Sequence, residues 1–300
     1  MYKRLAVAVI AGLFFVGLQT GRASGPAQHA QLLSVTRWQI PEGWFGGYSG
    51  LVLSEDGKEM IALSDRGHFV KATLTRSKMT SMRVENVHAY KVLNSGGEFE
   101  RKTGLRDSEG LARQTDGQLV VSFEGSHRIE RFRQPGESAQ RMPWSRALNA
   151  MVLNGGFEGI AKDAEGRLYA FPELPIGADD RMHGFRLEGN VWRQRFILKR
   201  DKQFQPVGMD FGPDGRLYLL ERGFNGLGFR TRVRSFAMSG DRLHDEKLLF
   251  HKGVGVHDNL EGLSVWRDEL GRIRLTMISD DNFRLLQRTE IVEYVLTKTP

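Results

Sequence analysis

Short apolar runs separated by glycine-containing turns recur along the whole chain. The clearest pattern is a glycine, a large apolar residue, five further residues and a second glycine. It occurs four times with this spacing and a fifth time with two extra residues, at Gly50–Gly57, Gly110–Gly117, Gly159–Gly166, Gly208–Gly215 and Gly262–Gly271. An apolar run follows each copy, and four copies place Asp-Gly or Glu-Gly at the turn. Because such pairs favour tight turns between strands, each copy predicts a β-hairpin.

The spacing of the copies predicts the fold class. Their first glycines lie 60, 49, 49 and 54 residues apart, which leaves room for two more strands in each repeat. Four-stranded repeats of about this length are typical of β-propeller blades. We therefore expect an all-β fold, a β-propeller with five blades. The main alternative is a sixth blade hidden between Gly57 and Gly110, and the fourth strand of the second blade is least clear, with Asn149–Leu153 as its candidate.

The two ends of the chain are expected to close the ring. A strand predicted within Gln31–Ile40 has no partner of its own, and the last copy is followed by an apolar run, Thr289–Leu296, that supplies only a third strand. The N-terminal strand can therefore serve as the missing outer strand of the last blade. Closure of this kind removes the exposed strand edges that an open array would leave.

The N-terminus has the pattern of a secretory signal peptide over residues 1–23. A basic start is followed by an apolar run, Leu5–Leu18, and by small residues before an expected cleavage site at Ala23. We expect a single propeller domain over residues 24–300 and a periplasmic or secreted location. An uncleaved anchor is the alternative, but the apolar run is short for a membrane span.

Composition and charge exclude several classes of function. The chain has no cysteine, so disulfides and thiolate-bound metals are excluded. Its net charge is +7, and removal of residues 1–23, which hold three basic residues and no acid, leaves 40 basic and 36 acidic residues. The basic residues are scattered, so we expect no nucleic-acid partner and, after cleavage, no membrane. We expect a monomer with a small anionic ester as substrate, which a mild positive field would favour.

Acidic residues recur beside the repeat glycine. The first strand of a propeller blade borders the central channel, so the residues before the five glycines should converge on one mouth. These residues are Ser49, Glu109, Glu158, Val207 and Glu261. Three carboxylates near one axis repel one another unless a cation offsets their charge, and oxygen ligands suit Ca²⁺ or Mg²⁺. Alternatively, each glutamate accepts hydrogen bonds from a neighbouring blade or pairs with an arginine; both interpretations stay open.

A second acidic set follows the second strand of every copy. Because a tight turn brings the far ends of its two strands together, we expect this set at the same mouth. It consists of Asp65, Glu124, Glu173, Glu221 and Asp280, accompanied by Arg66, Arg222, Asn282 and Arg284. Arginine can hold a phosphate or carboxylate through two hydrogen bonds. The alternative interpretation of each of these residues is solvated charge at a loop end.

Four segments together resemble a known family. They are DSEGLA (Asp107–Ala112), GGFEGIAKDAEGRLYAFPE (Gly155–Glu173), QPVGMDFGPDGRLYLLERGF (Gln205–Phe224) and DNLEGLSVW (Asp258–Trp266). They resemble the phytase-like family, exported bacterial proteins described as having esterase-like activity of phytase, over roughly residues 34–296. The resemblance implies a β-propeller with hydrolase activity on phosphate or carboxylate esters, assisted by Ca²⁺. It marks the Glu-Gly positions and the loop ends as the site, and the loss of the acid at Ser49 and Val207 implies an asymmetric one.

The resulting hypothesis is a hydrolase assisted by a divalent cation, with Ca²⁺ favoured and Mg²⁺ the alternative. The expected cation ligands are Glu109, Glu158, Glu261, Glu173 and Asp280. The expected catalytic residues are Glu109, Glu158, Glu261, Arg66 and Arg222. The expected substrate-binding residues are Asp65, Glu124, Glu221, Arg284 and Asn282. A cation would activate water, which suits a chain without a nucleophile elbow, HExxH motif or P-loop.

Two other functions remain open at this stage. A propeller is a permissive scaffold, so the chain can instead be a non-catalytic module that binds a small anionic ligand or a protein partner. A sugar lactonase-like hydrolase, using a cation in the same channel, is the other alternative.

Overall fold

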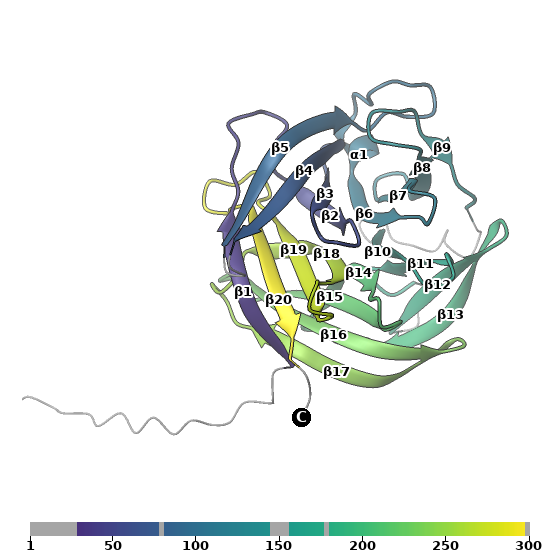
Figure 1. The fold of residues 1–300 in the computed structure, drawn as a ribbon. Coiled ribbons are helices and arrows are strands. Elements are labelled where there is room, and N and C mark those ends of the chain that lie inside the picture. The colour runs from purple at the N-terminus through teal and green to yellow at the C-terminus, as the bar shows by residue number, and fades with distance from the viewer. Residues whose placement is uncertain (1–28, 78–80, 145–155, 177–179, 298–300) are drawn as a thin grey trace, which may run out of the picture.

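The computed structural model of the chain describes residues 29–77, 81–144, 156–176 and 180–297. The expected signal peptide and the candidate strand at residues 149–153 lie outside these residues. The described strands form five antiparallel sheets of four strands each, arranged in a ring (Figure 1). The prediction of a five-bladed β-propeller is therefore confirmed. No helix of the described residues is long and apolar enough to cross a membrane.

Each sheet is one blade. Within a blade, the strands are arranged side by side from the centre of the ring to its outside. The first blade contains β2 (Tyr48–Leu53), β3 (Glu59–Ser64), β4 (His68–Ser77) and β5 (Ser81–Lys91). The second contains β6 (Ser108–Arg113), β7 (Leu119–Phe123), β8 (Arg128–Phe132) and β9 (Gln140–Arg141). The third contains β10 (Phe157–Lys162), β11 (Leu168–Pro172), β12 (Arg181–Glu188) and β13 (Val191–Lys199). The fourth contains β14 (Gln205–Phe211), β15 (Leu217–Phe224), β16 (Phe229–Ser239) and β17 (Arg242–Lys252).

The last blade joins the two ends of the chain. It contains β18 (Asn259–Arg267), β19 (Ile273–Asp280), β20 (Glu290–Leu296) and the N-terminal strand β1 (Ala30–Arg37), which pairs antiparallel with β20. Figure 1 shows β1 in purple beside β20 in yellow. The predicted closure by the N-terminal strand is therefore confirmed.

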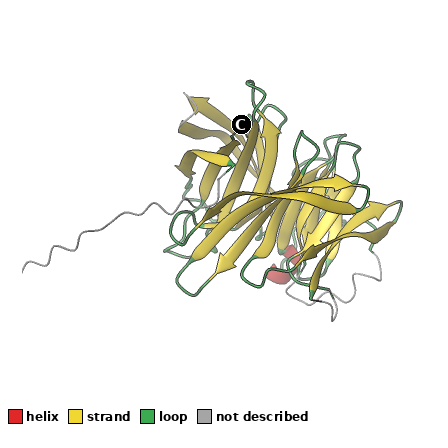
Figure 2. Cartoon of the chain, turned by 90° about the horizontal axis from the view of Figure 1, so that it is seen from below, coloured by secondary structure: helices red, strands yellow, loops and turns green. Residues whose placement is uncertain are grey.

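The segment in which a sixth blade was considered belongs to the first two blades. After β5 the chain forms the short helix α1 (Thr103–Arg106) and enters β6 directly. In Figure 2, the rest of the described chain consists of strands and loops. The second blade takes its fourth strand from β9, which pairs with β8 through Glu130 and Arg141.

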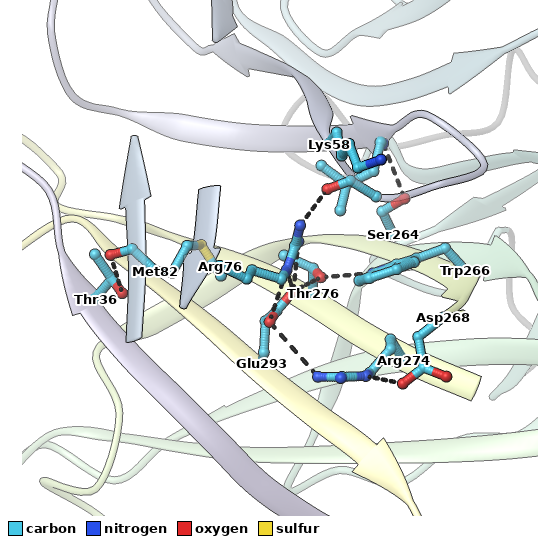
Figure 3. A network of polar contacts seen from close by, with 12 residues as sticks. Thr36, Lys58, Arg76, Met82, Ser264, Trp266, Asp268, Arg274, Thr276 and Glu293 are labelled. Carbon is cyan, nitrogen blue, oxygen red and sulfur yellow. Dashed lines mark hydrogen bonds and ion pairs between the residues drawn. The ribbon is translucent and has the colours of Figure 1, made fainter. Parts of the chain in front are cut away.

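Polar side chains lock the last blade to the first, as Figure 3 shows. The Nη2 atom of Arg76 on β4 lies 2.7 Å from Oε1 of Glu293 on β20. The same guanidinium donates to the carbonyl oxygen of Gly57 and lies over the ring of Trp266, 4.6 Å from its centroid. Thr276 Oγ1 donates to the Glu293 carboxylate group at 2.9 Å. Closure of the ring thus rests on side chains as well as on the β1–β20 ladder.

The repeat glycine is required where neighbouring blades touch. A Cβ atom on Gly50 would lie 2.7 Å from Leu111 of the next blade, and one on Gly110 would lie 2.9 Å from the carbonyl oxygen of Glu158. Around the ring, a Cβ on Gly208 would lie 2.3 Å from the carbonyl oxygen of Glu261. The inner strands of successive blades therefore approach too closely for any side chain at this position.

The apolar residue after each repeat glycine closes the middle of the channel. These five residues are all buried and line a passage of about 10 Å³; they are Leu51, Leu111, Ile160, Met209 and Leu263. A space of this size holds about one water molecule. The channel is therefore divided into two separate mouths.

Gly208→Ala should destabilise the protein by about 1–3 kcal/mol, the usual cost of overpacking. The new methyl group would meet backbone rather than a movable side chain. The matched control is Gly253→Ala, because nothing lies within 4 Å of its Cβ position. Urea unfolding of the two variants measures the difference, and equal midpoints would show that contact between inner strands does not account for the repeat glycine.

Candidate active site

A β-bulge turns the residue before each repeat glycine out of the strand ladder. In every blade the register between the first and second strand shifts at this point, for example between Phe157 and Gly159 and between Leu260 and Gly262. The extra residues in these two strands are Glu158 and Glu261. Because a bulge re-aims a side chain that the ladder would otherwise fix, it explains how these glutamates reach the channel mouth.

The loop-end acids lie at the same mouth, as the hairpin geometry predicts. The amide of Glu124 donates to the carbonyl oxygen of Asp107 at 2.9 Å, and that of Glu173 donates to Gly156 at 3.2 Å. These bonds tie the end of each second strand to the start of its inner strand. Together the two sets form what we call the acidic mouth, consisting of Asp65, Asp107, Glu109, Glu124, Glu158, Glu173, Glu261 and Asp280.

Arg222 pairs with two of the acids in one half of the acidic mouth. Its guanidinium group forms an ion pair with Glu261, and its Nη2 atom lies 3.1 Å from Oε1 of Glu173. Asn259, which is fully buried, donates to Glu261 Oε1 at 2.8 Å and to Asp280 Oδ2 at 3.3 Å. We call these five residues the arginine half. Here the interpretation that a Glu-Gly glutamate pairs with an arginine holds for Glu261, and the loop-end acid Glu173 shares the same arginine.

The other half of the acidic mouth consists of Asp65, Asp107, Glu109, Glu124 and Glu158, and we call it the carboxylate half. One oxygen each from Asp107, Glu109 and Glu124 lies within 4.8 Å of the others, so these three residues form a group that could hold a metal ion. Oδ1 of Asp65 is buried and has no hydrogen-bond partner in the described structure. The carboxylate half thus gathers acids that form no ion pair with Arg222 in the described structure, although the charge of Arg222 acts on Glu158.

Burial and mutual repulsion raise the pKa values of these acids. Burial, reinforced by the charges of Glu158 and Glu261, raises the pKa of Glu109 well above its usual range. Burial also raises the pKa of Asp65 to about 7, with Asp280 and Asp107 as further causes. The pKa of Glu124 is raised to about 7, again mainly by burial. Asp65 and Glu124, with pKa values of about 7, exchange protons near neutral pH or lose them to a bound cation.

The loop after β19 forms the exposed rim of the mouth. Asp281 accepts a hydrogen bond from the amide of Gly47 at 3.0 Å, which fixes this loop to the first blade. Asn282 is exposed, and its amide donates to Asp280 Oδ1 at 2.6 Å. The guanidinium group of Arg66 stacks on the ring of Phe283, 3.1 Å from its centroid. Arg66 is thereby held at the solvent side of the acidic mouth.

Two of the expected site residues are not brought into the cluster. Glu221 is buried on β15, and its carboxylate is held by Arg232 at 2.7 Å and by Arg234 at 2.6 Å. Its side chain therefore belongs to a buried ion-pair network and does not face the acidic mouth. Arg284 lies exposed on the loop after β19, where its amide donates to Asp281.

Sequence reasoning missed Asp107 and Asn259. Both stand three residues before the repeat glycine, near the position that the Glu-Gly pattern singled out. Polar residues at this second fixed offset are the signal that would have identified them. Each stands two residues before a Glu-Gly glutamate, and residues two apart in an extended chain point to the same side.

The sequence comparisons identify one family. A family model described as esterase-like activity of phytase, phytase-like, matches residues 43–283. No curated protein matches the chain.

Solved structures with a similar fold share little sequence with the chain. The PQQ-bound aldose sugar dehydrogenase from Streptomyces coelicolor is 12% identical, with a TM-score of 0.48, over 91% of this chain and 100% of that one. A protein of unknown function from Dyadobacter fermentans is 10% identical, with a TM-score of 0.49, over 90% and 88% of the two chains. A gluconolactonase from Xanthomonas campestris is 13% identical, with a TM-score of 0.43, over 83% and 72%. These likenesses carry no argument about the function of this chain.

Proposed function

The chain belongs to the phytase-like family, and from this premise we propose that it is an exported, periplasmic or secreted hydrolase of phosphate or carboxylate esters. The family description supports a hydrolase-like enzyme on a propeller scaffold. The substrate class, the cation and the export are our proposal. The observation that carries it is the carboxylate half of the acidic mouth, where Asp107, Glu109 and Glu124 gather and form no ion pair with an arginine among the described residues.

The residues of the carboxylate half fit a divalent cation. Asp107, Glu109 and Glu124 offer three hard oxygen ligands within 4.8 Å of one another, which is the donor set that Ca²⁺ prefers and that Mg²⁺ also accepts. A bound cation would polarise the ester and lower the pKa of a water molecule. The ion would also offset the charge of neighbouring carboxylates, which adds to burial in raising the pKa of Glu109 and of Glu124.

Arg222 and Arg66 would bind and orient the anionic group of the substrate. Ion pairs with Glu173 and Glu261 hold the Arg222 guanidinium group in one orientation, and Arg66 stands at the exposed rim on Phe283. Two guanidinium groups can stabilise negative charge that develops on a phosphate or carboxylate. Oδ1 of Asp65, which has no partner in the described structure and whose pKa is raised to about 7, would hold or release a proton near neutral pH.

Hydrolysis of an ester panel tests the proposal. The purified chain, freed of metal by a chelator, is mixed with p-nitrophenyl phosphate, p-nitrophenyl acetate and a sugar lactone, with and without about 1 mM Ca²⁺ or Mg²⁺, a concentration chosen to exceed typical weak calcium affinities. We expect hydrolysis of at least one ester that requires the cation. Hydrolysis of the lactone alone would favour the lactonase alternative. Absence of any hydrolysis would contradict the proposal and favour a binding module.

A further inference from the structure

A second mouth opens at the opposite end of the channel, where the inner hairpins turn. It forms a cavity of about 800 Å³, a volume typical of sites for small molecules. The ring of five apolar residues in the middle of the channel separates it from the acidic mouth, since the passage there measures about 10 Å³. We call it the turn-side cavity; it is a separate space from the site described above.

Two cationic side chains line the turn-side cavity from neighbouring blades. Arg113 is the last residue of β6, and Lys162 is the last residue of β10, so both stand three residues after their repeat glycines. Both are half-buried, and the contacts of the described residues give neither of them an ion pair. Burial lowers the pKa of Arg113, and the charge of Glu59, which pairs with Lys71, only partly opposes this shift.

The carboxylates that line the cavity are engaged elsewhere or exposed. Asp163 accepts from Arg167 Nε at 2.5 Å and from the Arg167 amide at 2.8 Å. Asp210 accepts from the amides of Val265 and Phe211, at 2.7 and 2.8 Å. Glu55 lies exposed at a hairpin turn. Lys162 feels the charge of Asp210, but the two backbone bonds hold that carboxylate on its own strand and on β18.

A third cation and an apolar wall complete the lining. Arg267 donates to the carbonyl oxygens of Gly271 and Pro213, so its charge is not neutralised by those bonds. Leu53, Phe211 and Val265 supply apolar surface to the same cavity. Cations beside an apolar wall suit a ligand that carries both a negative group and an apolar body.

We propose that the turn-side cavity is a binding site for a small organic anion with an apolar body, whose negative group is held by Arg113 and Lys162. The site does not depend on the proposed ester hydrolysis. It has its own lining, and the apolar ring separates it from the acidic mouth.

Binding of 8-anilinonaphthalene-1-sulfonate (ANS) tests this proposal, because the probe combines a sulfonate with aromatic rings and contains no ester. Isothermal titration calorimetry, carried out far below the unfolding temperature, measures the affinity for ANS of the wild-type chain and of the double variant Arg113→Gln/Lys162→Gln. We expect the wild type to bind one ANS molecule. The double variant should bind ANS with an affinity at least about tenfold lower, a change equivalent to about 1.4 kcal/mol. The variant should keep its thermal midpoint, since neither side chain forms an ion pair within the described residues.

Two control variants distinguish binding in the turn-side cavity from binding elsewhere on the protein. Lys58→Gln removes an exposed cation that pairs with Asp56, and Glu109→Gln alters the acidic mouth; both should bind ANS as the wild type does. Methanesulfonate, which has the headgroup without the rings, should not displace ANS at equal concentration. Failure of the wild type to bind ANS, or equal affinity in the double variant, would overturn the proposal. Displacement by methanesulfonate would overturn its apolar part.

Discussion

Glu109→Gln should reduce cation-dependent ester hydrolysis by about a hundredfold or more, a loss typical of removing one charged group from a preorganised site. Glu109 belongs to the group with Asp107 and Glu124 that could hold a metal ion. The amide keeps the shape of the side chain but removes its charge. Steady-state kinetics at saturating Ca²⁺ measure the effect as a fall in kcat/KM.

The loss should occur without loss of stability. Burial and neighbouring carboxylates raise the pKa of Glu109 well above its usual range, so its charge destabilises the metal-free protein, and the neutral amide should unfold no earlier than the wild type. The matched control is Glu221→Gln, a glutamate one residue from Arg222 that faces Arg232 and Arg234. It should be less stable yet keep its turnover per folded molecule. The reverse pattern in the two variants would contradict the assignment of the site.

Arg222→Gln should destabilise the protein by about 3 kcal/mol at neutral pH, the low end of the cost of removing one partner from a buried ion pair. The change leaves Glu173 and Glu261 without their cation, and these side chains are only 14% and 9% exposed. Arg66→Gln is the matched control, because Arg66 is exposed and stacks on a ring. Chemical denaturation of both variants measures the difference, and equal stabilities would show that Arg222 does not neutralise this mouth.

The loss of unfolding free energy caused by Arg222→Gln should become smaller as the pH falls. Burial raises the pKa of Glu261 and of Glu173 even with Arg222 present, and loss of the arginine raises them further. An acid whose pKa is higher in the folded than in the unfolded protein stabilises the fold below its unfolded pKa and loses that contribution as the pH rises. Unfolding measured between about pH 5 and pH 8, the range above the ordinary glutamate pKa, should therefore show the largest deficit at the alkaline end. A constant deficit would mean that the two glutamates remain charged throughout.

The repeat predicted the fold because local and long-range demands coincide in it. The Asp-Gly turns dictate the hairpins, and the glycine that begins each copy is the residue that permits inner strands to touch, as Gly208 and Glu261 illustrate. The partner of the N-terminal strand was predictable because the last copy lacked one strand. The fourth strand of the second blade was not, because β9 consists of Gln140 and Arg141 alone and leaves no apolar pattern.

The sequence predicted where the acidic mouth lies, but not which side chains point into it. Alignment on the glycine indicated Glu109, Glu158 and Glu261, since every copy repeats the same bulge. Spacing along the chain does not say which way a side chain leaves its strand, so Glu221 and Arg222, adjacent in sequence, were both expected at the site. In the structure only Arg222 reaches it, because neighbouring residues of a strand point to opposite faces. The division into two halves depends on the ion pairs of Arg222 with Glu173 and Glu261, which belong to the two neighbouring blades. A local sequence pattern does not predict such contacts between blades.

The most direct test of the account is thermal unfolding of the metal-free chain during titration with Ca²⁺ and then Mg²⁺. A cation that binds only the folded protein at a hundred times its dissociation constant adds about 2.7 kcal/mol, which is about 5 °C for a domain of this size. We expect such a rise for the wild type, larger near pH 8 than near pH 5 because Glu124, a proposed ligand with a pKa of about 7, must lose its proton to bind the ion. We expect no rise for Glu109→Gln. An unchanged midpoint of the wild type at millimolar ion would contradict the cation site and with it the proposed hydrolase.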